Sequence, residues 1–162
     1  MDQNKTILGV LIAVLILAAA YFFYFRSAPE ATIPAPEDVT AIPTGATITE
    51  DGIGIRFLQQ GDGENFPTLA DEITIHYTGW QTDGVMFDSS RLRGEPSTFP
   101  LGGLIAGWEL SVPLMSKGSR ALIWIPGDLA YDNRPDRPDA PKGMLVFDIE
   151  LIDIIAAGGS TR

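Results

Sequence analysis

Residues 73 to 93 read ITIHYTGWQTDGVMFDSSRLR, and this stretch predicts a β-hairpin. Its first half alternates isoleucines and Tyr77 with polar residues, the pattern of a strand with one buried face. An Asp-Gly pair then supplies the turn, and a shorter apolar run follows. The Asp-Ser-Ser that ends this run favours leaving a sheet, because such side chains bond nearby backbone. We therefore expect Tyr77, Phe87 and Asp88 to converge near one sheet edge.

Four further segments are predicted to be strands. Alternating apolar residues within 47–60 and the apolar runs Ser119 to Ile125 and Met144 to Ile155 are typical of strands, and Thr98 to Leu101 of a short edge strand. In Met144 to Ile155 apolar side chains alternate with acids, which predicts one face in the core and one in water.

One short helix is predicted between these strands. Leu104, Trp108 and Val112 recur at helical spacing with Ile105 beside them, and Pro113 marks the helix end. Because so short a helix does not persist alone in water, it must pack on the sheet. The sum is one α+β domain at 47–156, a twisted antiparallel sheet of about five strands wrapped around one short helix. We expect a flexible tail at 157–162.

The N-terminus predicts a membrane anchor within residues 1–26. Residues 6–25 carry no charge and match the roughly 20 residues that span a bilayer as a helix. The segment ends in aromatic residues, which suit a membrane interface. A cleaved signal peptide and a buried soluble helix are the alternatives. We expect the domain outside the cytoplasm, on the periplasmic side of a bacterial inner membrane.

Residues 27–46 are rich in proline and alanine and show no sustained period. They predict a semi-extended linker that holds the domain away from the bilayer. The alternative is that its last few residues pack on the domain as an extra strand.

Composition excludes several kinds of chemistry. The net charge of −10 argues against a nucleic-acid partner, and the lack of cysteine excludes thiolate chemistry. No metal-ligand spacing or phosphate loop is present, so we expect neither a metal nor a cofactor. The only histidine, His76, alternates with Tyr77 and is expected to be structural, on the opposite face of the sheet.

What the sequence does supply is an apolar cavity with a few polar atoms. Tyr, Asp and Trp in a small core need partners for their polar groups and tend to line pockets. The candidates are Tyr77, Phe87, Asp88, Phe99, Ile105, Trp108, Tyr131 and Phe147.

These residues lie in a series of short motifs. The motifs are HYTG at 76–79, DG at 83–84, FDSS at 87–90, LG at 101–102, GWE at 107–109, AY at 130–131 and LVFDIEL at 145–151. In this order and spacing, over roughly Ile53 to Ile154, the chain resembles the FK506-binding-protein (FKBP) type of peptidyl-prolyl cis-trans isomerase. That family's fold, an antiparallel sheet wrapped round one short helix, agrees with the prediction above.

The resemblance implies roles for the pocket residues. The substrate proline would rest on Trp108, and the Ile105 N–H and Tyr131 hydroxyl would bind the flanking carbonyls. The residues implied for catalysis are Tyr77, Phe87, Asp88, Ile105, Trp108, Tyr131 and Phe147; those implied for substrate binding are Phe99 and Leu104.

The resemblance also implies an activity and partners. The substrates would be proline-containing polypeptides of the exported or membrane-proximal kind, and a macrolide would be a ligand. Rotation of a peptide bond breaks no bond between heavy atoms, so no cofactor is needed. The alternative is a non-catalytic chaperone or partner-binding module. The chain departs from the family at Ser97, at Asp132 and in the charged segment from there to Gly143, all at the lip of the pocket.

Overall fold

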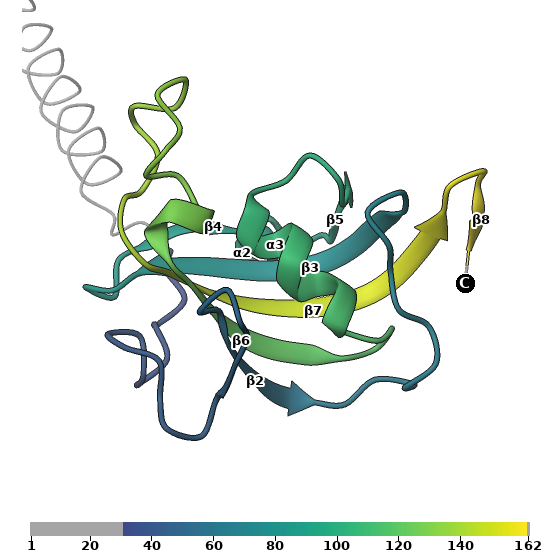
Figure 1. The fold of residues 1–162 in the computed structure, drawn as a ribbon, viewed down its shortest axis with the longest axis horizontal. Helices are drawn as coiled ribbons and strands as arrows, with labels where there is room; N and C mark the ends of the chain where they lie inside the picture. Colours follow the sequence, from purple (N-terminus) through teal and green to yellow (C-terminus); the bar gives the residue numbers. More distant parts are fainter. Residues whose placement is uncertain (1–30, 162) are drawn as a thin grey trace, which may run out of the picture. The chain divides into compact units, whose positions relative to one another are not determined.

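The computed structural model describes residues 31–161. From Thr32 onward these residues form one compact unit built on a single antiparallel sheet, with a short helix lying across one face (Figure 1). The fold therefore has the predicted FKBP-like architecture.

The described residues contribute eight strands to this sheet. They are β1 (Thr47–Ile48), β2 (Gly54–Gln59), β3 (Glu72–Gln81), β4 (Met86–Ser89), β5 (Ser97–Pro100), β6 (Arg120–Ile125), β7 (Leu145–Ala156) and β8 (Ser160–Thr161). The main order is β1-β2-β6-β7-β3-β4, with β5 paired to β3 and β8 to β7. The prediction of about five strands was too low because the shortest pairings, of two residues each in β1 and β8, leave no period in the sequence.

The predicted hairpin is formed by β3 and β4. Gly84 has a φ of +86°, which glycine adopts without strain, and the Val85 N–H donates to Asp83 Oδ1 over 2.9 Å. β4 ends at the helical turn α2 (Ser90–Arg93), where the Ser89 hydroxyl accepts a hydrogen bond from the Leu92 N–H. The Asp-Ser-Ser segment thus leaves the sheet as predicted.

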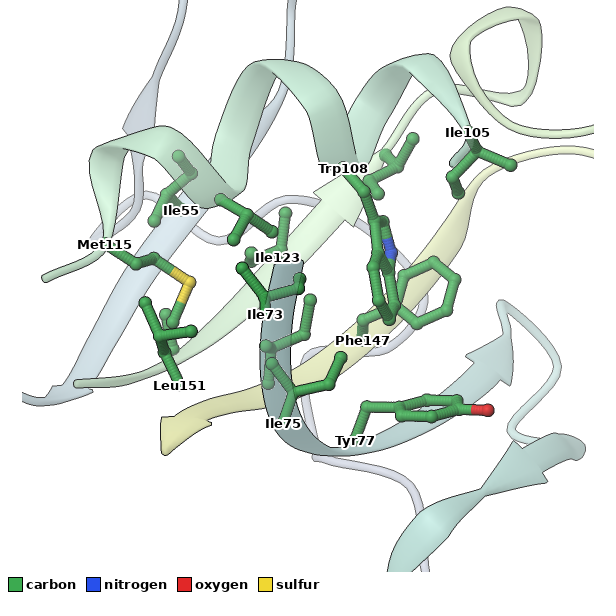
Figure 2. Packing of buried hydrophobic residues seen from close by; sticks show 14 of the residues in the cluster. Ile55, Ile73, Ile75, Tyr77, Ile105, Trp108, Met115, Ile123, Phe147 and Leu151 are labelled. Atoms are coloured by element: carbon green, nitrogen blue, oxygen red, sulfur yellow. The ribbon is translucent and has the colours of Figure 1, made fainter. Parts of the chain in front are cut away.

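The predicted helix consists of α3 (Ala106–Ser111) and the 3-10 turn η1 (Val112–Leu114). Pro113 lies within η1, because proline cannot continue the α-helical hydrogen bonds. A Cβ on Gly107 would overlap the Ile125 side chain, so glycine allows the helix backbone to approach β6 closely. Figure 2 shows Trp108 directed from this helix toward the sheet, with Ile105 at the end where the helix begins.

The core fills the space between α3 and the sheet. It takes the inward-facing side chains of β3, β6 and β7, among them the fully buried Ile73, Ile75, Ile123 and Leu151 (Figure 2). Burying one such side chain contributes about 1.5–3 kcal/mol. The core thereby fixes the strands and the helix that carry the candidate site.

The opposite face of the sheet is only partly exposed to water. Residues 33–46, which we call the strap, pack on a second apolar cluster formed by Trp80, Leu122, Trp124 and Val146. The indole N–H groups of Trp80 and Trp124 donate to the backbone carbonyls of Ile33 and Asp38 over 2.8 and 2.9 Å.

Over residues 33–46 the structure thus differs from the predicted spacer. A proline-rich segment makes few backbone ladder bonds, but here side-chain burial and the two indole donors hold it. The prediction that the outer face of β7 is wet is wrong in part. Val146 is buried under the strap, and Asp148 is buried in a pair with Arg120 at 2.6 Å, whereas Glu150 is partly exposed.

The C-terminal end also differs from the flexible tail that was predicted. Gly158 and Gly159, both at positive φ, reverse the chain, and β8 then pairs with the end of β7. The anchor predicted at residues 6–25 lies outside the described residues. Between residues 31 and 161 no helix is both long and apolar enough to cross a bilayer.

Candidate functional site

A cavity of about 240 Å³ opens between α3, the inner face of the sheet and the 127–143 segment. The structure brings all nine predicted site residues to it: Tyr77, Phe87, Asp88, Phe99, Leu104, Ile105, Trp108, Tyr131 and Phe147. One further residue, Arg137, also lines the cavity. The sequence therefore predicted the lining correctly except for this arginine.

The floor of the cavity is a box of aromatic rings around Trp108. The ring centroid of Trp108 lies 5.5 Å from that of Tyr77, 5.2 Å from that of Phe147 and 6.5 Å from that of Phe99, and all three contacts are edge to face. Edge-to-face pairs are favoured by the ring quadrupole and hold the rings in place. In Figure 2 the indole, the Phe147 ring and the Tyr77 ring surround one space.

Gly79 makes room for this box. A Cβ at this position would lie 2.5 Å from Phe87 Cζ and 3.0 Å from Phe147 Cε1. Phe87 and Phe147 instead pack edge to face at 5.6 Å over the bare backbone. The glycine of the HYTG motif is therefore required by the packing of two cavity residues.

A polar cluster closes one wall. The Tyr77 hydroxyl donates to Asp88 Oδ2 over 2.5 Å, and Arg93 Nη1 donates to Asp88 Oδ1 over 2.5 Å. Arg93 Nη2 also donates to the Tyr77 hydroxyl, over 2.9 Å, and to Ser97 Oγ, over 3.3 Å. Ser97, one of the positions at which the chain departs from the family that it resembles, thus adds a hydrogen-bond partner for Arg93.

This cluster keeps fixed protonation states. Burial and the hydrogen bond to the Asp88 carboxylate raise the pKa of Tyr77 above its usual 10.0. Burial acts to raise the pKa of Asp88, but hydrogen bonds from Tyr77 and Arg93 outweigh it, and the pKa falls below its usual 3.8. At neutral pH the wall is a neutral phenol beside an ion pair, which orients groups and does not transfer protons.

Two donors at the cavity are available to a ligand. Ile105 precedes α3 in extended conformation, and within residues 31–161 nothing accepts a hydrogen bond from its N–H. The Tyr131 hydroxyl likewise lacks a partner in that part of the chain, although the Tyr131 carbonyl accepts from Lys142 Nζ over 2.6 Å. These are the two donors that the resemblance assigned to carbonyls flanking a proline.

Residues 132–143, which we call the rim loop, border the cavity beside Tyr131. Asp132 Oδ1 accepts from the Gly143 N–H over 2.8 Å and closes the loop at its base. Successive turns link Arg134 to Tyr131, Arg137 to Arg134 and Ala140 to Arg137. This order places Arg137 at the cavity, a position that no sequence period reveals; a long charged loop beside the AY pair was the only signal.

The remaining titratable groups do not suggest another chemistry. His76 lies on the opposite face from Tyr77, where its Nδ1 lies 3.1 Å from the buried Ser90 hydroxyl, in agreement with a structural role. Over residues 31–161 there is no cluster of three acidic or histidine side chains suited to a metal ion.

Comparisons with known proteins agree with this geometry. The family model for FKBP-type peptidyl-prolyl cis-trans isomerase matches residues 63–152. An FKBP-type 22 kDa peptidyl-prolyl cis-trans isomerase from Escherichia coli is 42% identical over 112 residues, which cover 68% of this chain and 54% of the relative. FK506-binding protein 1 of the yeast Debaryomyces hansenii is 45% identical over 104 residues, 62% of this chain and 92% of its own length.

A solved structure supports the same relationship. The crystal structure of FkpA from Escherichia coli matches with a TM-score of 0.65 at 33% identity, over 71% of this chain and 54% of that one. The chain thus spans about half the length of these two Escherichia coli relatives and nearly all of the yeast protein. By its family match, its fold and its cavity, the chain belongs to the FKBP-type peptidyl-prolyl cis-trans isomerase family.

Proposed function

We propose that the chain accelerates cis-trans isomerisation of X-Pro bonds in polypeptides. The observation that carries this proposal is the aromatic box around Trp108 with two unpartnered donors, the Ile105 N–H and the Tyr131 hydroxyl, at its edge. An apolar ring of proline fits the box, and carbonyls on either side of it fit the donors.

The chemistry needs no reacting group on the protein. Rotation through about 90° removes amide resonance, at a cost of about 18–20 kcal/mol. A twisted amide is less polar than a planar one, so an apolar cavity disfavours the planar ground state relative to the transition state. The donors hold the neighbouring peptide groups while the bond turns. Since uncatalysed isomerisation takes tens to hundreds of seconds, such a catalyst is useful wherever chains fold.

The test is the cis-to-trans rate of a short X-Pro peptide with the full chain in a non-ionic detergent. We expect acceleration that depends on Trp108 and Phe147. If the folded protein binds the peptide but does not accelerate its cis-trans isomerisation, the result favours the alternative, a non-catalytic chaperone or partner-binding module.

We further propose that a macrolide competes with substrate for this cavity. The support is the apolar lining and the family relationship to a yeast protein named FK506-binding protein 1. The measurement is inhibition by FK506 of the cis-trans isomerisation of the X-Pro peptide. An unchanged isomerisation rate at saturating FK506 contradicts the proposal.

We also propose that residues 6–25 anchor the chain in a membrane with the domain on the extracytoplasmic side. The support is the uncharged length of this segment alone. Alkaline extraction of membranes tests the anchor, and protease protection in spheroplasts tests the side. Release of a shortened chain from the membrane would instead support a cleaved signal peptide.

A further inference from the structure

The mouth of the cavity carries a cation that bond rotation does not require. Arg137 is exposed, and it lines both the central cavity and a smaller hollow of about 100 Å³ beside it. This side hollow is bounded by Gly103, Leu104, Ile105, Tyr131, Arg134 and Arg137. It therefore adjoins both of the donors assigned to the peptide groups next to the proline.

Arg137 has no direct ion-pair partner among the charges around the cavity, although Asp136 lies near enough to interact with it electrostatically. Asp88 is paired with Arg93, and Arg134 Nε pairs with Asp136 Oδ1 at 3.3 Å. In the described part of the chain Arg137 makes no ion pair within 4.0 Å. Two arginines, Arg134 and Arg137, line the side hollow and no acidic side chain does, although Glu109 Oε1 accepts a hydrogen bond from the N–H of the lining residue Gly103 over 2.7 Å.

A second hollow, which also borders Tyr131 and Arg137, is lined by more acidic side chains. It is bounded in part by Asp88, Asp136 and Asp139 in addition to Arg137. An acidic side chain of a bound peptide would be repelled by the carboxylates there and attracted by the arginines beside Ile105. The two hollows thus present different charges beside the cavity.

We propose that Arg137 makes this protein select X-Pro substrates in which a residue next to the proline is Asp or Glu, the carboxylate lying in the side hollow. This inference rests on the isomerase function proposed above. Because the guanidinium is exposed, the preference is modest, about two- to fivefold in kcat/KM. Arginine suits the role, since its planar donors bind a carboxylate in bidentate fashion.

The acidity of the whole chain does not oppose this preference at physiological salt. The net charge of −10 repels anions at a distance, but charges more than about 8 Å apart are largely screened at 0.15 M salt. The contact with Arg137 is shorter than this and is screened less. The preference is therefore expected to come from the short-range contact with Arg137 in the bound complex. It is not expected to come from long-range attraction of the peptide to the protein.

The experiment compares matched peptides with uncharged ends, carrying Glu or Gln directly before or directly after the proline. Exchange rates measured by NMR with the full chain give the Glu-to-Gln ratio of kcat/KM for each position. We expect a ratio of about two to five at one position, a ratio near one for Arg137→Gln, and an intermediate ratio for Arg137→Lys, which keeps the charge but not the bidentate geometry. Using a ratio removes any general loss of activity in a variant. Salt at about 0.5 M is expected to reduce the wild-type ratio toward one.

Arg56→Gln provides the control, because it removes the same charge at a position paired with Asp38 and away from the cavity. Its ratio is expected to equal that of the wild type. A wild-type ratio of one at both positions, or a ratio that Arg137→Gln leaves unchanged, overturns the proposal. If no peptide is turned over, the isomerase function fails; chemical-shift titration with the Glu and Gln peptides then still measures whether Arg137 sets a binding preference.

Discussion

The rings of Trp108 and Phe147 meet edge to face with centroids 5.2 Å apart. One ring comes from the short helix and the other from β7, so the box proposed to receive a proline depends on how the helix lies on the sheet. Trp108 is only 5% exposed and belongs to the core as well as to the cavity.

Replacing Trp108 with leucine is expected to lower kcat/KM by at least about tenfold, because it removes ring contacts worth about 0.5–1.5 kcal/mol each. The fold is expected to persist, since leucine keeps much of the buried apolar volume. Val112→Ala is the matched control: Val112 is fully buried in the same core but does not line the cavity. It is expected to lower stability and leave kcat/KM close to wild type. Equal loss of activity in both variants would show that the effect of Trp108 is only on folding.

Gly79→Ala is expected to lower activity through Phe87 and Phe147, which a Cβ at this position would displace. Both rings line the cavity, so a loss of at least about fivefold in kcat/KM is expected from the weakened ring contact. Gly45→Ala introduces the same methyl group where nothing lies within 4 Å, and it is expected to have little effect. A Gly79→Ala protein as active as the Gly45→Ala protein contradicts this role.

Acid is expected to disrupt the wall formed by Tyr77, Asp88 and Arg93. The pKa of Asp88 is lower in the folded protein than its usual 3.8, so its contribution to stability is present above that value and is lost as pH falls through the folded-state pKa. Near neutral pH the protonation of these three side chains does not change, so we expect activity to vary little with pH there. Below about pH 4 we expect the domain to lose stability.

Asp88→Asn checks this assignment by unfolding in denaturant as a function of pH. At pH 7 the variant is expected to be less stable by about 1 kcal/mol, a small value because the ion pair is partly exposed to solvent. Its deficit relative to wild type is expected to shrink toward pH 3. A deficit that stays constant from pH 7 to pH 3 would place the acid sensitivity elsewhere.

The strap is expected to stabilise the domain from the face opposite the cavity. Val39 packs on the cluster that contains Trp80 and Trp124 and is only 7% exposed. Val39→Ala is expected to lower the free energy of unfolding by about 1.5 kcal/mol, because it removes two buried methyl groups. Val85→Ala makes the same change at a side chain that is 55% exposed and is expected to shift stability by less than about 0.5 kcal/mol. Similar small shifts in both variants would mean that the strap binds only loosely.

The sequence predicted the inner face of the sheet because period-2 alternation reports burial directly. Tyr77 and Phe147 follow from that alternation, and Trp108 from the helical spacing around it. Arg137 did not follow, since a loop position is set by its turns and by the Asp132 closure, and neither leaves a period.

The strap was also not predicted, although a signal for it existed. Trp80 alternates with Gly79 onto the outer face of β3, and Trp124 lies between the inward-facing Ile123 and Ile125. Two tryptophans on a face interpreted as wet require a cover. The proline-rich composition suggested a free linker because proline content predicts few backbone hydrogen bonds. It does not predict whether the side chains pack on the domain.

The strap sets a constraint on the order in which the domain can be completed. It is the first part of the domain to be synthesised, yet its binding surface includes Trp124 and Val146, and Trp124 lies 86 residues after its partner Asp38. The strap's full binding surface exists only once β6 and β7 have been made and paired, because before then only the part from β3 is present. During translation the strap must therefore wait for most of the domain before it can make all of its contacts.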